Sequence, residues 1–448
     1  MQRTTDMTKG NPAKLILTFA LPLIIANLGQ QFYQITDAAI VGRGVGVKAL
    51  AAVGSTDWIN WLILWTITGF TQGFSTFLAR HFGNKDYTAL NKTLATSVTL
   101  CLIIGVLLTI FGFWCGRPLL NILGTPLDII EDAEIYLLTL IAGTVIVTGY
   151  NMTASVLRAL GDGKSPLIAM VIAGVLNIGL DLLFVMVFDL GVFGAAFASV
   201  LAQLFSFLYC LIQIRKIDCI HLTRQSFKAE FKRIKEMLYF SLPLALEYIV
   251  IALGGIVLQA AINAEGSFFV AGYTATNKLY SLLESSSISL GIACSTYFAQ
   301  NFGAKEFKRV RQGVKTGTIL AILFSVVVSV IALVFGKPML SMFLDVTKEG
   351  GTEAMAVAWR YLFCLALFLS VLYLIHIYRN ALQAIGTSFW SMVSGFGELV
   401  VRVVFATVVI RYIGVEILYY IEPAAWIAAL LLVIVPYFPY AKKALKNR

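Results

Sequence analysis

The sequence contains few charged residues, few histidines and no paired cysteine motif. Only 13% of its 448 residues are Asp, Glu, Lys or Arg, against about 25% in a typical soluble domain. Hydrophobic residues make up 59% of the chain, and the mean hydropathy is +0.84. This composition excludes an ordinary soluble protein and indicates an integral membrane protein.

The histidines and cysteines do not form a recognisable metal site. The three histidines, His81, His221 and His376, share no ligand-like spacing, which argues against a zinc or haem enzyme. The six cysteines are scattered in or beside apolar segments, so we interpret them as small hydrophobic residues. We therefore expect no cofactor and no enzymatic activity.

Apolar runs of about 20 residues, long enough to cross a bilayer, recur along the chain. They predict an all-α membrane protein of twelve transmembrane helices at about 15–41, 55–79, 93–115, 135–157, 166–188, 192–214, 238–263, 273–298, 316–340, 359–381, 388–410 and 419–440. The connection at 189–191 is the shortest. The first run lacks a small-residue cleavage site, so we interpret it as a retained span and not as a signal peptide.

The net charge of +10 does not indicate a nucleic-acid partner. The cations lie in short loops, where their distribution sets the topology of a membrane protein. With the N-terminus inside, the inward loops hold 25 Lys and Arg residues and the outward loops hold 7. This positive-inside bias predicts a multi-pass protein of the cell membrane, inner or plasma, with both termini in the cytoplasm.

A basic stretch at 215–235 divides the chain near its midpoint. It predicts an N-terminal lobe at 1–214, a cytoplasmic linker at 215–237 and a C-terminal lobe at 238–448. The part at 226–237 is compatible with an amphipathic helix on the anionic inner leaflet. A solvated linker is the competing interpretation, and we favour it.

The two halves repeat each other. Residues 75–86 match 295–306 at an offset of 220, with six of twelve positions identical. Shorter matches occur in the same order: 19–22 with 240–243, 116–120 with 336–340, and 158–161 with 383–386. Because each half has six helices, an even number, both start on the same side. The sequence therefore predicts parallel six-helix lobes related by a pseudo-two-fold axis along the membrane normal, as in alternating-access transporters.

Polar residues in the first predicted helix mark a candidate site. Asn27, Gln30, Gln34 and Asp37 recur at helical spacing, and Tyr33 precedes Asp37 by one turn. An acid inside a spanning helix costs roughly 2.5–3.5 kcal/mol and by default marks function. Asn177 and Asp181 show the same four-residue spacing in the fifth helix.

If those faces meet, two carboxylates, an amide and a phenol share one pocket, and Ser199 adds a hydroxyl. This oxygen-rich pocket suits a Na⁺ ion at Asp37, Asn177 and Asp181. Alternatively, the two acids share a proton.

The second half carries different charges. Glu247 and Glu284 are candidates for binding a cationic substrate, and Lys278 is a potential partner for one of them. His376 is interpreted as a gate or as an interhelical hydrogen-bond donor. Glu398 and Arg402, four residues apart, are expected to form a structural ion pair, because a lone buried charge is costly.

Several of these motifs together resemble the multidrug and toxic compound extrusion (MATE) family. They are the early Pro22 with Asp37, the run Ala49-Leu-Ala-Ala-Val-Gly54, the loop glycines Gly83 and Gly303, and the stretch Arg158-x-x-Gly-Asp162-x-x-x-Pro166. The resemblance covers the whole chain. It implies two lobes forming a V-shaped cavity, with efflux driven by inward Na⁺ or H⁺ flow.

The prokaryotic branch related to DinF carries a polar site in the N-terminal lobe, and its residues match Tyr33, Asp37, Asn177, Asp181 and Ser199. The NorM-like branch has an acid pair on helices seven and ten. Here Glu247 is only roughly placed for the first acid, and the tenth helix has none. Gly397-Glu398-x-x-x-Arg402 resembles the variant of Gram-positive relatives.

These observations favour an ion-coupled antiporter that exports organic cations or a small metabolite and works as a monomer in the lipid bilayer. A lipid-linked oligosaccharide flippase of the same superfamily is the alternative, but it favours a basic cavity. A membrane-embedded enzyme or a receptor is a third class.

Gly161-Asp-Gly-Lys-Ser165 lacks the first glycine of a phosphate-binding loop, so we expect an ion gradient to supply the energy.

Overall fold

The computed structural model describes residues 4–344, 346–347 and 350–446, apart from the side chains of residues 32–35, 37–39, 43 and 47. The described residues form helices and connecting turns, without a strand. The helices are α1 (Pro12–Gly44), α2 (Val47–Gly83), α3 (Tyr87–Ile122), α4 (Ile130–Ala142), α5 (Thr144–Ala159), α6 (Lys164–Asp181), η1 (Leu182–Val187), α7 (Gly191–Ile214), α8 (Phe231–Asn263), α9 (Ser267–Gly303), α10 (Phe307–Leu340), α11 (Gly351–Ile385), α12 (Phe389–Val404), η2 (Phe405–Val409), α13 (Ile410–Ile413), η3 (Val415–Tyr420) and α14 (Ile421–Ala444).

The prediction of twelve membrane-crossing helices is confirmed. Ten helical segments of the described chain are long and apolar enough to cross a bilayer, and the bent pair α4 and α5 forms an eleventh. A further helix, α9, is long enough at 37 residues but is less apolar, because it carries Asn277, Lys278, Glu284 and several serines. Its polarity is the first structural indication that this helix does more than span lipid.

Two local predictions need correction. The loop expected at 42–54 is nearly absent, because α1 runs to Gly44 and α2 begins at Val47. The predicted helix at 135–157 is two helices, which bend by 47° at Gly143. Of the two interpretations of 226–237, the less favoured amphipathic helix does not form as a separate element: residues 224–227 make turns, and α8 itself begins at Phe231. At 189–191 the chain does turn, with Asp189 at φ +53°.

The chain forms two compact units, and the boundaries between them lie inside helices. Unit 1 comprises the described residues up to Asp6 and Leu21–Ala245, and unit 2 comprises Met7–Ala20 and the chain from Leu246 onwards. Both internal boundaries lie within two or three residues of a proline, Pro22 in α1 and Pro243 in α8. Proline inside a helix removes a hydrogen bond and favours a kink. The predicted lobe boundaries at 214 and 238 remain a prediction.

Unit 1 is built around α2 and α7. The apolar face of α2, including Ile59, Ile63 and Ile67, packs on Leu137 and Ile141 of α4. At its other end α2 meets the first part of α8 through Gly69 and Gly73. A Cβ at Gly69 would lie 2.5 Å from Ala245 Cα, and one at Gly73 would lie 2.9 Å from Ser241 Cα. This Gly-x-x-x-Gly pair lets two backbones touch.

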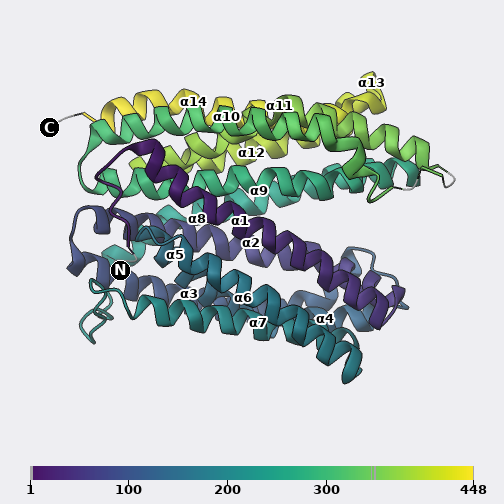
Figure 1. Cartoon of the computed structure of the whole chain (residues 1–448), viewed down its shortest axis with the longest axis horizontal. Helices are drawn as coiled ribbons and strands as arrows, with labels where there is room; N and C mark the ends of the chain where they lie inside the picture. The colour runs from purple at the N-terminus through teal and green to yellow at the C-terminus, as the bar shows by residue number, and fades with distance from the viewer. Residues whose placement is uncertain (1–3, 345, 348–349, 447–448) are drawn as a thin grey trace. The chain divides into compact units, whose positions relative to one another are not determined.

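Unit 2 is built around α11, which packs against α9, α10 and α14. Figure 1 shows these helices running alongside one another. Gly272 brings α9 close to α11, since a Cβ there would lie 2.5 Å from Ala354 O. Thr276 Oγ1 also donates to Ala358 O at 2.9 Å. Because α11 is enclosed, polar residues on it must find partners inside the unit.

Candidate functional site

The candidate site of unit 1 centres on α6 and α7. Asn177 and Asp181 lie one turn apart on α6, and they are 1% and 0% exposed. Asn177 Nδ2 donates to Ser199 Oγ of α7 at 3.3 Å. The structure therefore brings Asn177, Asp181 and Ser199 to one buried helix interface. Tyr33, Gln34 and Asp37 belong to α1, but their side chains lie outside the described residues, so their part in the site remains a prediction.

The start of α6 explains how the Gly161-Asp-Gly-Lys-Ser165 segment folds. Asp162 Oδ1 accepts from the backbone N–H of Ser165 at 2.9 Å and of Lys164 at 3.1 Å. Asp162 Oδ2 accepts from Ser165 Oγ at 2.6 Å. The carboxylate thus caps the helix and satisfies N–H groups that a phosphate loop would offer to its ligand. The segment positions α6.

Directly after Asp181 the chain forms a π-helix, η1. π-helical turns are rare and occur frequently at functional sites. The second half has its own π-helix, η2, which follows α12. The two start at residues 182 and 405, 223 positions apart, within the 220–225 range of the sequence repeat. Neither is signalled by hydropathy, and sequence reasoning missed both.

Apolar side chains close the site beyond Asp181. Val185 of η1 is 1% exposed and packs in a cluster with Val41 of α1 and Val192 of α7. Gly44 and Gly194 make room for η1, since their Cβ positions would lie 2.9 Å from Val185 Cγ1 and 3.1 Å from Phe184 Cβ. The buried carboxylate therefore lies one turn from a dry, tightly packed layer.

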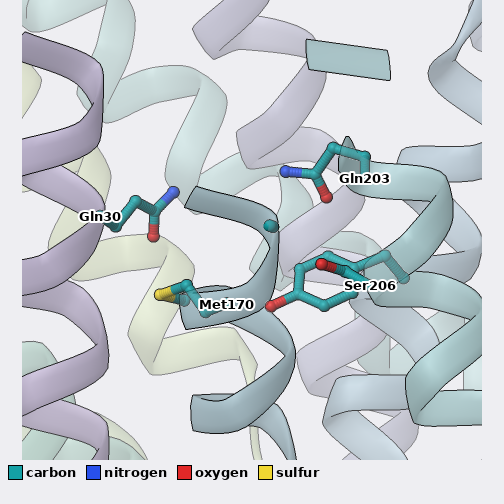
Figure 2. Close-up of a pocket in the computed structure, with 6 residues that line it drawn as sticks. Gln30, Met170, Gln203 and Ser206 are labelled. Carbon is teal, nitrogen blue, oxygen red and sulfur yellow. The ribbon is translucent and has the colours of Figure 1, made fainter. Parts of the chain in front are cut away.

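On the opposite side of the Asn177–Ser199 pair lies a small polar cavity. It is lined by Gln30, Tyr150, Met170, Ala173, Gln203 and Ser206. The centre of a water molecule can occupy a volume of ≈ 20 Å³ in this cavity. The cavity therefore has room for about one water. Figure 2 shows the amides of Gln30 and Gln203 extending toward each other across it.

Helical spacing connects this cavity to the buried pair. Ala173 precedes Asn177 by one turn of α6, and Gln203 follows Ser199 by one turn of α7. Gln30 comes from the polar face of the first helix, where Asn27 is half-buried. The arrangement offers a row of amides and hydroxyls that leads to Asp181, with space for water.

Unit 2 contains a buried network of charges. Arg379 of α11 lies 3.1 Å from Glu247 of α8 and 2.6 Å from Glu398 of α12. Arg402 of α12 lies 3.1 Å from Glu398 and 2.8 Å from Glu422 of α14. The side chains of the first four are 8% exposed or less, and that of Glu422 is 15% exposed. Three carboxylates and two guanidinium groups thus join four helices.

Glycines bring α8 and α12 together around this network. A Cβ at Gly254 would lie 3.0 Å from Arg402 Cδ, and one at Gly395 would lie 3.2 Å from Glu247 O. Arg379 Nε also donates to Ser394 Oγ at 2.8 Å. Glu247 Oε2, in contrast, accepts no hydrogen bond from the described residues. The network is well satisfied except at this one oxygen.

Glu247, predicted to bind a cationic substrate, is buried and forms an ion pair of this network with Arg379. Glu284 is half-buried on α9, while Lys278 is exposed, and no ion pair of either is found among the described residues. His376 is half-buried, and its carbonyl accepts from Asn380 Nδ2 at 2.8 Å. Sequence reasoning missed Arg379 and Glu422.

The described residues contain no group of three or more His, Cys, Asp and Glu side chains arranged to hold a metal ion. The Na⁺ site predicted at Asp37, Asn177 and Asp181 includes a side chain outside this description. It therefore remains a prediction. In such a site the ion is a transported species, and no resident cofactor is involved.

Twelve membrane-crossing helices, a repeated half and buried polar sites define a multi-pass membrane transport protein. The family model MatE matches residues 22–183 and matches again at 243–408. The chain belongs to the MATE family. The two matches begin at Pro22 and Pro243, the prolines beside the unit boundaries, so the internal repeat includes these two helix prolines.

Individual relatives agree with this assignment. The "Probable multidrug resistance protein YoeA" of Bacillus subtilis (strain 168) is 29% identical over 441 residues, covering 96% of this chain and 94% of the relative. A crystal structure of MATE in a bent conformation is 24% identical, with a TM-score of 0.88 and 98% of each chain covered. A MOP superfamily transporter from Pyrococcus furiosus is also 24% identical, with a TM-score of 0.90 over 99% of this chain and 100% of that one.

Proposed function

We propose that this protein is a secondary antiporter that exports a small molecule from the cytoplasm in exchange for Na⁺ or H⁺. Membership of the MATE family supports transport, and similarity to YoeA, a probable multidrug resistance protein, supports drugs as the class of substrate. The observation that carries the proposal is the fully buried Asp181 beside the Asn177–Ser199 pair. A proton or a sodium ion that neutralises a buried carboxylate lowers the cost of burying its charge.

The coupling follows from that charge. A carboxylate held in a low-dielectric site is strongly stabilised when a proton or a sodium ion neutralises it. Such a site biases the conformational equilibrium only if one conformation binds the cation better than the other. Asp181 and, from the sequence, Asp37 are the groups that the cation neutralises. Asn177 and Ser199 supply neutral oxygens.

The substrate proposed is an organic cation. The network of unit 2 holds three carboxylates against two guanidinium groups, and Glu284 adds a further acid on α9. A surplus of acid in the interior favours cationic over anionic substrates. It does not favour the pyrophosphate of a lipid-linked sugar, so the flippase alternative is not supported.

The fold alone does not fix the substrate. The structurally similar transporter from Pyrococcus furiosus is described as having a binding pocket of reverse polarity, which suggests a different function for that protein. We further propose that both termini are cytoplasmic in the cell membrane, as the 25 to 7 distribution of Lys and Arg predicts. All proposed site residues come from one chain, so a monomer suffices.

The test uses purified protein in liposomes loaded with a fluorescent organic cation. Sodium and pH gradients are imposed separately, and flux is compared with that of protein-free liposomes. We expect flux only when one of the two gradients is present. Gradient-independent flux, or no flux for a broad panel of cations and neutral metabolites, would contradict antiport.

A further inference from the structure

The first turn of α8 and the preceding Glu230 are fixed to the first turns of α3. Glu230 Oε1 lies 2.6 Å from Lys92 Nζ, and Glu230 Oε2 lies 3.0 Å from Arg233 Nη2. Lys92 first, and then Arg233, hold the pKa of Glu230 below its usual range. Arg233 Nη1 also donates to Ala89 O at 3.4 Å. The face of α8 that carries Arg233 therefore points to α3.

The linker before α8 is also fixed. Asn91 Nδ2 donates to Cys219 O at 3.0 Å, and Asn91 Oδ1 accepts from the N–H of His221 at 2.7 Å. Ser226 is 7% exposed, and its Oγ accepts from the N–H of Thr223 at 3.2 Å. Since both ends of the linker at 219–233 are held on α3, the side chains on its outer surface have fixed positions.

That outer surface combines cations with large apolar side chains. We call it the basic–aromatic face and define it by Arg224, Phe227, Lys228, Phe231, Lys232 and Lys235. All six side chains are exposed, with Phe227 at 49% and Phe231 at 79%. The four cations form no ion pair with the described residues, and the sole exposed acid between 219 and 240 is Glu236. The face is therefore strongly positive and partly apolar.

The same face continues along α8 into the membrane. Phe231, Lys235, Tyr239 and Leu242 recur at helical spacing, and Tyr239 and Leu242 are 82% and 50% exposed. Leu253, further along, is 46% exposed. Twelve residues of helix, from Phe231 to Leu242, rise by roughly 16 Å. This exceeds the thickness of one headgroup layer, about 5–8 Å, so the stripe is long enough to cross that layer.

We propose that the basic–aromatic face binds the headgroups of anionic phospholipids at the cytoplasmic membrane surface. Lysine stems lie along apolar surface while the ammonium reaches polar groups, and aromatic residues favour the membrane interface. Phosphate headgroups complement the four cations, and the interface complements Phe227 and Phe231. An acidic soluble protein fits less well, because the face is continuous with the lipid-facing stripe of α8.

The inference goes beyond antiport and does not depend on it. Anionic lipid bound here would hold α8, which carries Pro243 and Glu247, at a fixed depth in the membrane. It would do so through α3, to which the linker is tied by Asn91, Lys92 and Arg233. The ligand is a lipid, so a soluble phosphate should bind far more weakly.

The test measures binding of phosphatidylglycerol and phosphatidylcholine to the full-length protein in detergent by native mass spectrometry. The variant Lys228→Gln/Lys232→Gln/Lys235→Gln removes three charges of the face. A matched control, Lys442→Gln/Lys443→Gln/Lys446→Gln, removes three exposed charges from the C-terminal tail. Melting temperatures of both variants should equal that of the wild type, because the side chains are exposed.

We expect the wild type to prefer phosphatidylglycerol and the linker variant to lose this preference, with roughly a fivefold weaker binding for each lysine removed. The tail variant should retain it. Phe231→Ala should weaken binding of phosphatidylglycerol, and inorganic phosphate should not displace the lipid. Wild-type binding by the linker variant, or an equal loss in both triple variants, would overturn the proposal. Displacement of phosphatidylglycerol by inorganic phosphate would contradict a contribution of the apolar side chains to lipid binding.

Discussion

Arg379 Nε lies 3.1 Å from Glu247 Oε1, and both side chains are less than a tenth exposed. This contact changes the role that Glu247 of α8 is expected to have. The sequence presents Glu247 as an open carboxylate in a helix without an obvious partner. In the structure its charge is balanced inside unit 2 by a cation from α11. In unit 1 the fully buried Asp181 lies one helical turn from Asn177, whose amide donates to Ser199.

Replacing Arg379 tests this internal balance. Arg379→Met leaves Glu247 and Glu398 without their shared guanidinium, and breaking a buried pair from one side costs about 3–5 kcal/mol. We expect a large loss of thermal stability in detergent, measured by the unfolding of the purified protein. The control is Arg360→Met on the same helix, whose partner Glu416 is exposed; it should cost less than about 1 kcal/mol.

The double variant Arg379→Met/Glu247→Gln distinguishes charge from packing. Removing the acid together with the base should restore part of the lost stability, because less uncompensated charge remains. If the loss of stability in the double variant equals the sum of the losses in the two single variants, the charge contact does not stabilise unit 2.

The network also shows what the sequence alone does not resolve. Arg379 lies two residues before the end of the helix predicted at 359–381, but α11 runs to Ile385 and Arg379 is 7% exposed. Hydropathy ends a predicted helix at its first polar cluster, whereas a helix continues wherever those polar groups are satisfied inside the fold. Glu422 was missed for the related reason that its partner, Arg402, comes from another helix.

Gly69 provides a test of packing in unit 1. Gly69→Ala places a Cβ 2.5 Å from Ala245 Cα, so α2 and α8 must move apart. Overpacking of this kind costs about 1–3 kcal/mol. Gly54→Ala on the same helix meets no atom within 4 Å and serves as the control. Equal melting temperatures for the two variants would show that the close crossing is unimportant.

The N-terminal segment is held by α9 and α10. Arg309 Nη2 donates to Met7 O at 3.2 Å and to Gly10 O at 3.0 Å, and Asn301 Nδ2 donates to Met7 O at 3.0 Å. Arg309→Ala should increase amide hydrogen exchange in residues 7–14 by at least about tenfold, because one to two charged hydrogen bonds are lost. Arg311→Ala, which releases Leu445 O instead, should leave that exchange unchanged. An unaltered exchange rate in Arg309→Ala would show that Arg309 does not hold the N-terminal segment.

For the candidate site, the sequence predicts some relationships and not others. The four-residue spacing of Asn177 and Asp181 is sufficient to predict that both share one face of a helix. The contact with Ser199 agrees with the residue types expected from the family resemblance. The π-helix after Asp181 and the cavity beside Gln203 depend on packing between helices, which periodicity does not encode.

Asp181→Asn separates ion coupling from substrate recognition. The variant removes the charge and retains the shape, so we expect a changed dependence of flux on sodium or pH, while the order of preferred substrates stays the same. The measurement is flux in liposomes across separate sodium and pH series. Asp218→Asn, an exposed residue of the linker, is the control. A wild-type ion profile in Asp181→Asn removes this residue from the coupling site.

Coupled transport through the first helix is tested most directly by gradient-driven flux of a fluorescent organic cation in liposomes that contain Asp37→Asn. The side chain of Asp37 lies outside the described residues, and its role is proposed from the sequence. We predict that the variant folds and inserts like the wild type but shows no flux when a sodium or pH gradient is imposed. Wild-type gradient-driven flux in Asp37→Asn would contradict the proposal.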